Sequence, residues 1–411
     1  MATKEMYRKL AEVAVRRGVN VQKDQPLVIR ASVRDYEFVR MCVEEAYAAG
    51  AKSVSVDWSD DKITHMDYEN QSMDTLSEVP DWAYDRMKTR VDSGYCRMSI
   101  ISDRPGYLSD IDPDKVRTAS MASSKKFREF AYYSMNNVGQ WTVLGLPSQE
   151  WAEMVFPELP SEEAYAKLEE AIFMTSRVTE DTDPVENWKA HDAELIAHAE
   201  KMTKYNFREL HFTSKLGTDL YVQIVKDHIW AGGGCYTPKG VYFDPNIPTE
   251  EVFCMPEREG VNGIVYASKP LSYNGKLIED FWFRFENGKV VEHGARKEQE
   301  TLTGLLDYDE GSRHLGEVAL VPYDSPISRT GILFYNTLYD ENAACHLALG
   351  ECYPENLKGG TEMSEEELRE HGANSSLQHV DFMFGTEDMS VDGIQYDGTI
   401  VPVFRNGNFV F

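Results

Sequence analysis

Residues 26–58 read PLVIRASVRDYEFVRMCVEEAYAAGAKSVSVDW, and this stretch decides the predicted fold. Residues 26–31 and 53–58 are short runs rich in Val and Ile, which is typical of strands. Residues 36–49 lie between them and end at Gly50, so they predict a helix. A helix between two strands at this spacing indicates an α/β unit with parallel strands.

The same pattern of strands and helices continues through the first half of the chain. Residues 98–102 and 141–145 look like further strands of the same sheet. From about 148 to 204 the composition becomes helical and charged, and we expect this region to bridge two halves. No Gly-rich phosphate fingerprint follows these strands, so nucleotide binding has no support from a motif.

Beyond residue 206 short alternating strands are separated by Gly and Asn turns, as in residues 220–224 and 281–285. The sequence therefore predicts an α/β protein of two domains. Residues 1–205 form an N-terminal α/β domain with a mostly parallel sheet and a helical bridging region. Residues 206–411 form a β-rich α+β domain, which we expect to be the metal-binding catalytic domain because it contains the candidate residues described below.

The composition excludes several classes of function. The 411 residues carry a formal net charge of −27, which argues against nucleic acid or an anionic membrane as a partner. No run approaches the length of a transmembrane helix. The six cysteines are scattered and form no CxxC pair, which favours reduced thiols and a cytoplasmic location.

Polar residues inside apolar segments of the second half are the candidates for chemistry. In the predicted strand HVDFMF, period-two alternation places His379 and Asp381 on one face. Residues 340–349 have helical composition and stop at Gly350, so we expect His346 inside a helix. Taken singly, these residues also fit an exposed strand face and a core histidine bonded to a carbonyl.

Two glutamates complete the candidate set. Glu317 lies in the apolar run LGEVALV, and Glu257 lies in CMPEREG. A buried glutamate needs a partner, which a nearby arginine could also supply as an ordinary ion pair. Together with the two histidines and Asp381, these glutamates form a mixed nitrogen and oxygen set. Such a set suits two cocatalytic divalent ions with one bridging carboxylate, whose usual task is hydrolysis.

Several motifs in matching order resemble the thermophilic aminopeptidase family of metallopeptidases. The similarity is dense from about Gly232 to the C-terminus and looser over the first half. Its segments are residues 245–253 (PNIPTEEVF), 255–257 (MPE), 315–321 (LGEVALV), 340–350 (DENAACHLALG) and 379–383 (HVDFM).

The resemblance implies a two-metal aminopeptidase. Its motifs place the metal ligands on these residues: Glu257, Glu317, His346, His379 and Asp381. The family's tyrosine falls on Tyr353, so Tyr353 and Glu317 are the candidate catalytic residues, and the roles of bridging carboxylate and general base stay open. The ions are zinc, cobalt or manganese, with magnesium as a further candidate. Cys345 stands where many relatives have a small residue such as serine.

The resemblance also implies a homodimer that encloses its active sites, and substrates that are short peptides with a free N-terminus. Two alternatives share the ligand set. One is another two-metal hydrolase, either an amidase or a phosphoesterase, although the ligand motifs lack the Lys and Arg cluster that phosphate usually needs. The other is a non-enzymatic, metal-stabilised peptide-binding protein, although structural zinc prefers Cys ligands.

Overall fold

The computed structural model describes residues 2–411, and the chain divides into two compact units. Unit 1 comprises Met1–Asp192 and Gly234–Thr249, and unit 2 comprises Ala193–Gly233 and Glu250–Phe411. The predicted boundary at residue 205 therefore differs from the division seen here. The long helix α10 (Pro184–Tyr205) passes from one unit into the other, and residues 234–249 return to unit 1.

Unit 1 is built on a five-stranded sheet in the order β10-β4-β3-β1-β2, and all four strand pairings are parallel. The predicted parallel α/β sheet is thus confirmed. Its last strand comes from the returning segment, which sequence spacing alone did not indicate. The strands are β1 (Pro26–Ser32), β2 (Ser53–Ser59), β3 (Cys96–Ile101), β4 (Trp141–Gly145) and β10 (Asn246–Ile247), with a small hairpin of β8 (Cys235–Tyr236) and β9 (Tyr242–Phe243).

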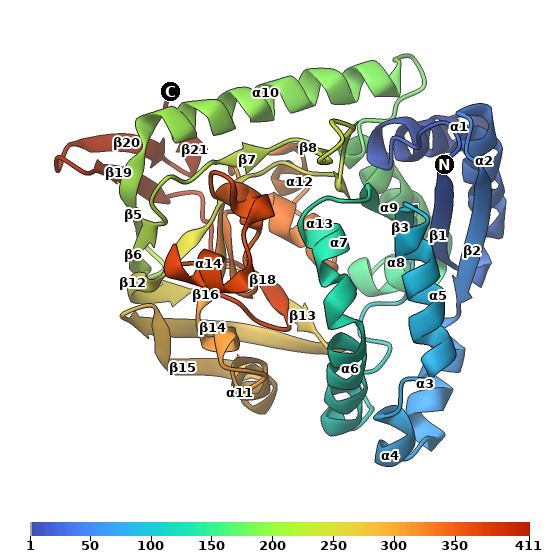
Figure 1. Ribbon diagram of the computed structural model, residues 1–411, viewed down its shortest axis with the longest axis horizontal. Coiled ribbons are helices and arrows are strands. Elements are labelled where there is room, and N and C mark those ends of the chain that lie inside the picture. The colour runs from blue at the N-terminus through green and yellow to red at the C-terminus, as the bar shows by residue number, and fades with distance from the viewer. Residues whose placement is uncertain (1) are drawn as a thin grey trace. The chain divides into compact units, whose positions relative to one another are not determined.

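The first helix of unit 1 packs into the core because it presents an apolar stripe. In the first helix, Leu10, Ala11 and Val13 are buried, and the Thr3 hydroxyl caps its N-terminus. The helices of unit 1 before α10 are α1 (Lys4–Val13), α2 (Tyr36–Ala48), α3 (Asp61–Asn70), α4 (Met73–Leu76), α5 (Asp81–Asp92), α6 (Pro113–Phe127), α7 (Ala131–Met135), α8 (Gln149–Val155) and α9 (Ser161–Thr175). Figure 1 shows them in blue to blue-green.

Unit 2 contains a nine-stranded sheet that runs β13-β14-β12-β6-β5-β19-β20-β21, with β15 paired to β14. The predicted strands at 220–224 and 281–285 lie within it. Its members are β5 (Phe207–Thr213), β6 (Asp219–Ile224), β12 (Pro256–Tyr266), β13 (Leu271–Tyr273), β14 (Lys276–Glu286), β15 (Lys289–Lys297), β19 (Ser390–Gln395), β20 (Ile400–Arg405) and β21 (Asn408–Phe409). Figure 1 shows β5, β6 and β12 side by side.

A second sheet of unit 2 runs β18-β17-β16-β11-β7 and is antiparallel. Its strands are β7 (Ala231–Gly232), β11 (Val252–Cys254), β16 (Leu315–Leu320), β17 (His346–Gly350) and β18 (His379–Met383). The short helices of unit 2 are α11 (Gln299–Leu306), α12 (Pro326–Arg329), α13 (Thr337–Asp340) and α14 (Glu365–Glu370). Single helical turns lie at Glu341–Ala343 and Pro354–Asn356.

The core of unit 2 lies against one face of this second sheet. Alternate residues of its strands are buried in that core, namely Val252, Cys254, Val318, Leu320, Leu347, Leu349 and Phe382. Because side chains alternate across a strand, the residues between them point to the opposite face. That opposite face carries the polar residues that the sequence singled out.

The helix predicted for residues 340–349 is wrong. The helical part ends with α13 and the turn Glu341–Ala343, and His346 begins β17. Strand β17 pairs with β16 on one side and β18 on the other, so tertiary pairing overrides the helix propensity of Ala and Leu. Gly350 does not cap a helix but ends the strand with a φ of +112°, a conformation that favours glycine.

Candidate metal centre

Two groups of buried or partly buried side chains on that opposite face of the second sheet could each hold a metal ion. Glu251, Glu317 and His346 form the first group, in which the ligand atoms lie within 4.8 Å of one another. The Nε2 atom of His346 lies 2.9 Å from Oε2 of Glu251 and 3.4 Å from Oε1 of Glu317. These three residues are 8%, 4% and 1% exposed, so solvent is largely excluded.

The second group shares one of these glutamates and consists of Glu317, His379 and Asp381. Nε2 of His379 lies 3.4 Å from Oε2 of Glu317 and 3.4 Å from Oδ1 of Asp381. Glu317 thus directs one carboxylate oxygen to each group. This is the arrangement of a carboxylate that bridges two neighbouring cation sites.

Strand register brings these residues together from distant parts of the chain. Glu317 of β16 is opposite Ala348 of β17, which in turn is opposite Asp381 of β18. In the next row, Ala319 is opposite His346. The two alanines contribute only methyl groups to the ligand face, so the longer ligand side chains have room to converge above the strands.

The two imidazoles are held in one orientation by backbone carbonyls. Nδ1–H of His346 donates to the carbonyl oxygen of Glu341 at 2.9 Å, and Nδ1–H of His379 donates to that of Glu351 at 2.7 Å. Each donor fixes the tautomer that leaves a lone pair on Nε2. Both lone pairs therefore face carboxylate oxygens, which is favourable only with a proton or a cation between them.

The electrostatics of the centre agree with that requirement. Burial alone would lower the pKa of His346, but the neighbouring Glu251 and Glu317 raise it well above its ordinary value. Burial would raise the pKa of Glu317, but His346 and His379 lower it to about 2. Burial raises the pKa of Glu251, so negative charge is held mainly on Glu317, and positive charge is drawn to the Nε2 atoms of the two histidines.

Buried oxygen atoms test whether a metal fits. Among the described residues 2–411, Oε2 of Glu251 and Oδ1 of Asp381 are buried and make no hydrogen bond. Oε2 of Glu251 is close to His346 but lacks the alignment of a hydrogen bond. Buried carboxylate oxygens are costly unless paired or coordinated. Imidazole nitrogens with carboxylate oxygens are the ligands that zinc, cobalt and manganese accept, so the residues fit a metal.

Tyr353, the predicted catalytic tyrosine, lies beside this centre. Its ring centroid is 4.9 Å from that of His379, at an interplanar angle of 59°. Within the described part of the chain no hydrogen bond involves its hydroxyl group. Burial raises the pKa of Tyr353, so the group stays a neutral hydrogen-bond donor at physiological pH.

The positions of Glu257 and Glu251 differ from what the sequence-based ligand set led us to expect. The structure brings four of the five predicted ligands together but leaves Glu257 outside both groups, where it lies half-buried at the start of β12. Glu251 stands with the ligands instead. The sequence contained a signal for Glu251, because this glutamate directly precedes the apolar run Val252–Cys254. Glu317 was singled out for a similar reason, since it lies within an apolar run.

Glu341 is a second acidic residue that the sequence analysis did not single out. It is 8% exposed, and burial, together with the charges of Asp381 and Glu251, raises its pKa well above the ordinary value. Its neighbour Asn342 accepts a hydrogen bond from the backbone N–H of Glu250 at 2.7 Å. The turn that carries Glu341 thus also positions the segment leading to Glu251.

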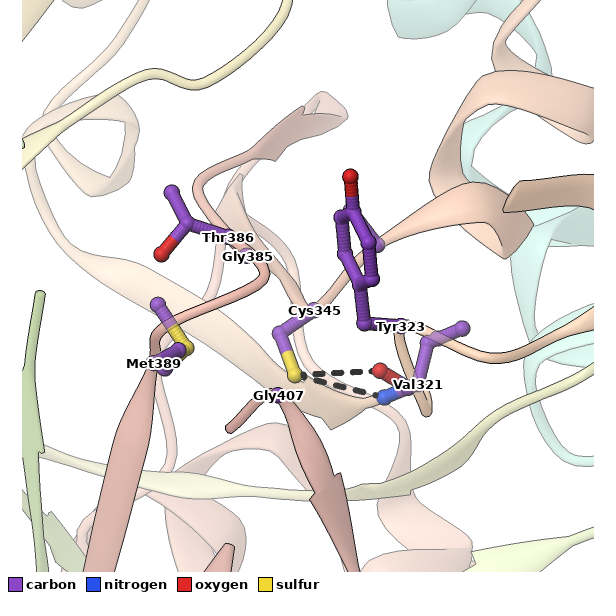
Figure 2. A pocket seen from close by; sticks show the side chains of 8 residues that line it. Val321, Tyr323, Cys345, Gly385, Thr386, Met389 and Gly407 are labelled. Carbon is purple, nitrogen blue, oxygen red and sulfur yellow. Dashed lines mark hydrogen bonds between the residues drawn. The ribbon is translucent and has the colours of Figure 1, made fainter. Parts of the chain in front are cut away.

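Cys345 precedes the candidate ligand His346 but turns away from the candidate metal centre. Figure 2 shows its sulfur beside Val321, where Sγ lies 3.4 Å from both the backbone N–H and the carbonyl of that residue. Burial raises the pKa of the Cys345 thiol to about 11. The thiol therefore stays protonated and packs in the small apolar pocket that Met389 and Gly407 also line.

Comparison with known proteins decides the family. A model of the thermophilic metalloprotease (M29) family matches residues 3–409. The chain belongs to this family. The resemblance noted in the sequence is therefore confirmed, and membership of the M29 metalloproteases implies a divalent metal cofactor and peptide substrates.

Similar proteins cover this M29 chain from end to end. Aminopeptidase AmpS of Bacillus subtilis is 44% identical over 401 residues, covering 98% of this chain and 97% of its own. Aminopeptidase T of Thermus aquaticus is 43% identical over 406 residues, covering 99% and 98%. The structure of wild-type AmpT from Thermus thermophilus superimposes with a TM-score of 0.91 at 40% identity and covers both chains fully.

No helix in residues 2–411 of this M29 chain is both long and apolar enough to cross a bilayer. The formal net charge of −27 has the opposite sign to that needed for binding anionic lipid.

Proposed function

We propose that this protein is a two-metal aminopeptidase that removes N-terminal residues from short peptides. The observation that carries the proposal is the position of Glu317, which directs one carboxylate oxygen to His346 and the other to His379. A single structural ion would leave one of these groups without its cation. Two cations that share Glu317 account for both.

The proposed ligand set is Glu251, Glu317, His346, His379 and Asp381. Glu341 adds a further carboxylate close to these residues. Divalent cations balance such a concentration of negative charge, and zinc, cobalt or manganese suits the donors better than magnesium, which prefers oxygen ligands alone. When bound, the cations supply Lewis acidity toward a carbonyl oxygen and lower the pKa of water toward neutrality.

The protein's own residues bind and orient the peptide. The Tyr353 hydroxyl makes no hydrogen bond within residues 2–411 and can donate to the oxyanion that develops when the first peptide carbonyl is attacked. The Glu341 carboxylate lies outside the ligand set and can accept hydrogen bonds from the peptide's α-amino group. An enzyme that anchors this amino group acts only at the first peptide bond, which makes it an exopeptidase.

The same residues weigh against the two alternatives. A phosphoesterase needs cations that clamp the phosphate, and the residues with the largest effects on the pKa values of Glu251, Glu317 and His346 are acidic residues and histidines, not lysine or arginine. A purely structural metal site is closed by its protein ligands, usually with cysteines. Cys345 and Cys352 are buried and protonated instead. Assembly as a homodimer and a cytoplasmic location stay predictions.

A direct assay follows the release of leucine from a leucyl dipeptide. Protein stripped with chelator should be inactive, and addition of Zn²⁺, Co²⁺ or Mn²⁺ should restore release. The N-acetylated peptide is the matched control and should be resistant, because its amino group cannot be anchored. Failure to release any of several N-terminal residues in the presence of metal contradicts the proposal, and cleavage of the acetylated peptide indicates an amidase or endopeptidase.

A further inference from the structure

Phe253 lies on the same face of the sheet as the metal ligands. Its neighbours on β11, Val252 and Cys254, are 1% and 0% exposed and belong to the core, so alternation directs Phe253 to the opposite side with Glu251. Unlike these neighbours, Phe253 is partly exposed. The exposed part of its ring is therefore available to an apolar group that approaches the candidate metal centre.

Aromatic rings connect Phe253 to the metal centre. Its ring centroid lies 5.7 Å from that of Tyr353, in an edge-on arrangement at 67°. The ring of Tyr353 in turn lies 4.9 Å from the imidazole of His379. Phe253 and Tyr353 therefore form one apolar surface, called here the aromatic wall, that begins at a metal ligand and extends away from it.

The register of the strands leaves little side-chain bulk between this wall and the ligands. Phe253 is opposite Ala319 of β16, and Ala319 is opposite His346 of β17. Only the methyl group of Ala319 stands between the phenylalanine and the histidine on this face. A side chain attached to an atom held at the metal centre would therefore meet the aromatic wall first.

We infer that the aromatic wall of Phe253 and Tyr353 binds the side chain of the substrate's first residue and makes the enzyme favour large apolar residues there. The inference rests on the proposed aminopeptidase function and adds the determinant of its selectivity. A peptide whose α-amino group and first carbonyl are held at the ligands has only one side chain close to the centre. Contact with two aromatic rings favours leucine or phenylalanine over glycine in that position.

Phe253→Ala tests the inference through a ratio of two activities. The kcat/KM for a phenylalanyl dipeptide is divided by that for a glycyl dipeptide with the same second residue. The ratio should fall about tenfold or more in the variant, because a hydrophobic pocket discriminates by about that factor when it loses part of its apolar contact. Phe253→Leu, which keeps an apolar side chain, should recover part of the ratio.

Two controls separate selectivity from damage to the fold. Tyr396→Ala removes another aromatic residue of unit 2, which is 50% exposed, and should leave the ratio as in wild type. Metal content, measured by mass spectrometry, should be the same in all variants. An equal loss of activity toward both dipeptides in Phe253→Ala overturns the inference, since Phe253 would then only shield the metal centre.

Calorimetry with free amino acids provides a reading that does not depend on turnover. Metal-loaded wild type should bind L-phenylalanine more tightly than glycine, and Phe253→Ala should lose about tenfold in affinity for L-phenylalanine alone. Equal affinities in wild type and variant overturn the inference even where peptides are cleaved. Absence of peptide cleavage in wild type instead contradicts the proposed function, while this binding difference would still support the wall.

Discussion

Replacing Glu251 with glutamine removes one negative charge from the metal centre and keeps the size of the side chain. Oε2 of Glu251 lies 2.9 Å from Nε2 of His346 and makes no hydrogen bond among the described residues, so the substitution removes an ion pair with His346 but no hydrogen bond at that atom. The substitution is therefore expected to act mainly on the affinity for the cation. Glu257→Gln is the matched control, because it makes the same chemical change at the half-buried glutamate outside both ligand groups.

The size of the effect follows from charge and distance. A unit charge about 4 Å from a divalent ion contributes about 8 kcal/mol at an effective dielectric constant of about 20. If desolvation of the carboxylate offsets half of this, about 4 kcal/mol is lost, or about a thousandfold in affinity. We expect Glu251→Gln to lose about that much affinity for one ion, and Glu257→Gln to bind as wild type does.

The assay is a metal titration of chelator-treated protein, followed by calorimetry and by the release of leucine at each addition. Circular dichroism of the metal-free proteins shows whether both variants are folded. Loss of metal in Glu257→Gln with wild-type binding in Glu251→Gln would refute the reasoning. That outcome would restore the ligand assignment that the sequence motif MPE suggested.

Three further predictions concern other residues. Tyr353→Phe should lower kcat by a factor of about 10² to 10³ with metal content unchanged, because it removes a hydrogen-bond donor to the oxyanion. An unchanged kcat in steady-state assays would contradict that role. Asn342→Ala removes the acceptor for the backbone N–H of Glu250 and should weaken metal binding by about 10- to 100-fold in the same titration. Unchanged metal affinity would contradict a role of this turn in positioning Glu251. Burial, assisted by Arg177, lowers the pKa of His191 from 6.5 to about 3, so the unfolded chain takes up a proton that the folded protein does not. Stability therefore falls as the pH drops below about 6.5, by about 2 kcal/mol at pH 5, and urea unfolding of His191→Gln at pH 7 and pH 5 should show less of this loss than wild type.

Local patterns predicted much of the fold because the relevant signals are short-range. The Val- and Ile-rich runs became β1 and β2, and the alternation in HVDFM became β18 with His379 and Asp381 facing one side. The helix expected around His346 failed for the opposite reason. Its residues suit a helix taken alone, but β16 and β18 supply strand partners from distant parts of the chain.

The ligand set shows the same limit. Glu317 was found because a carboxylate inside an apolar strand needs a partner, and β16 buries it. Glu251 and Glu257 have similar sequence surroundings, and the choice between them depends on whether β11 or β12 faces the histidines. That choice is set by pairing of β11 with β16, which no local pattern encodes. The return of residues 234–249 to unit 1 is equally non-local.

The most direct test of the proposed two-metal centre is the number of ions bound per chain in wild type and in Glu317→Gln. Glu317 is the residue that both ligand groups share. The account predicts two ions in wild type and the loss of both in the variant, measured by mass spectrometry after dialysis at a fixed concentration of free metal. A Glu317→Gln protein that is folded and keeps the wild-type number of ions would contradict it.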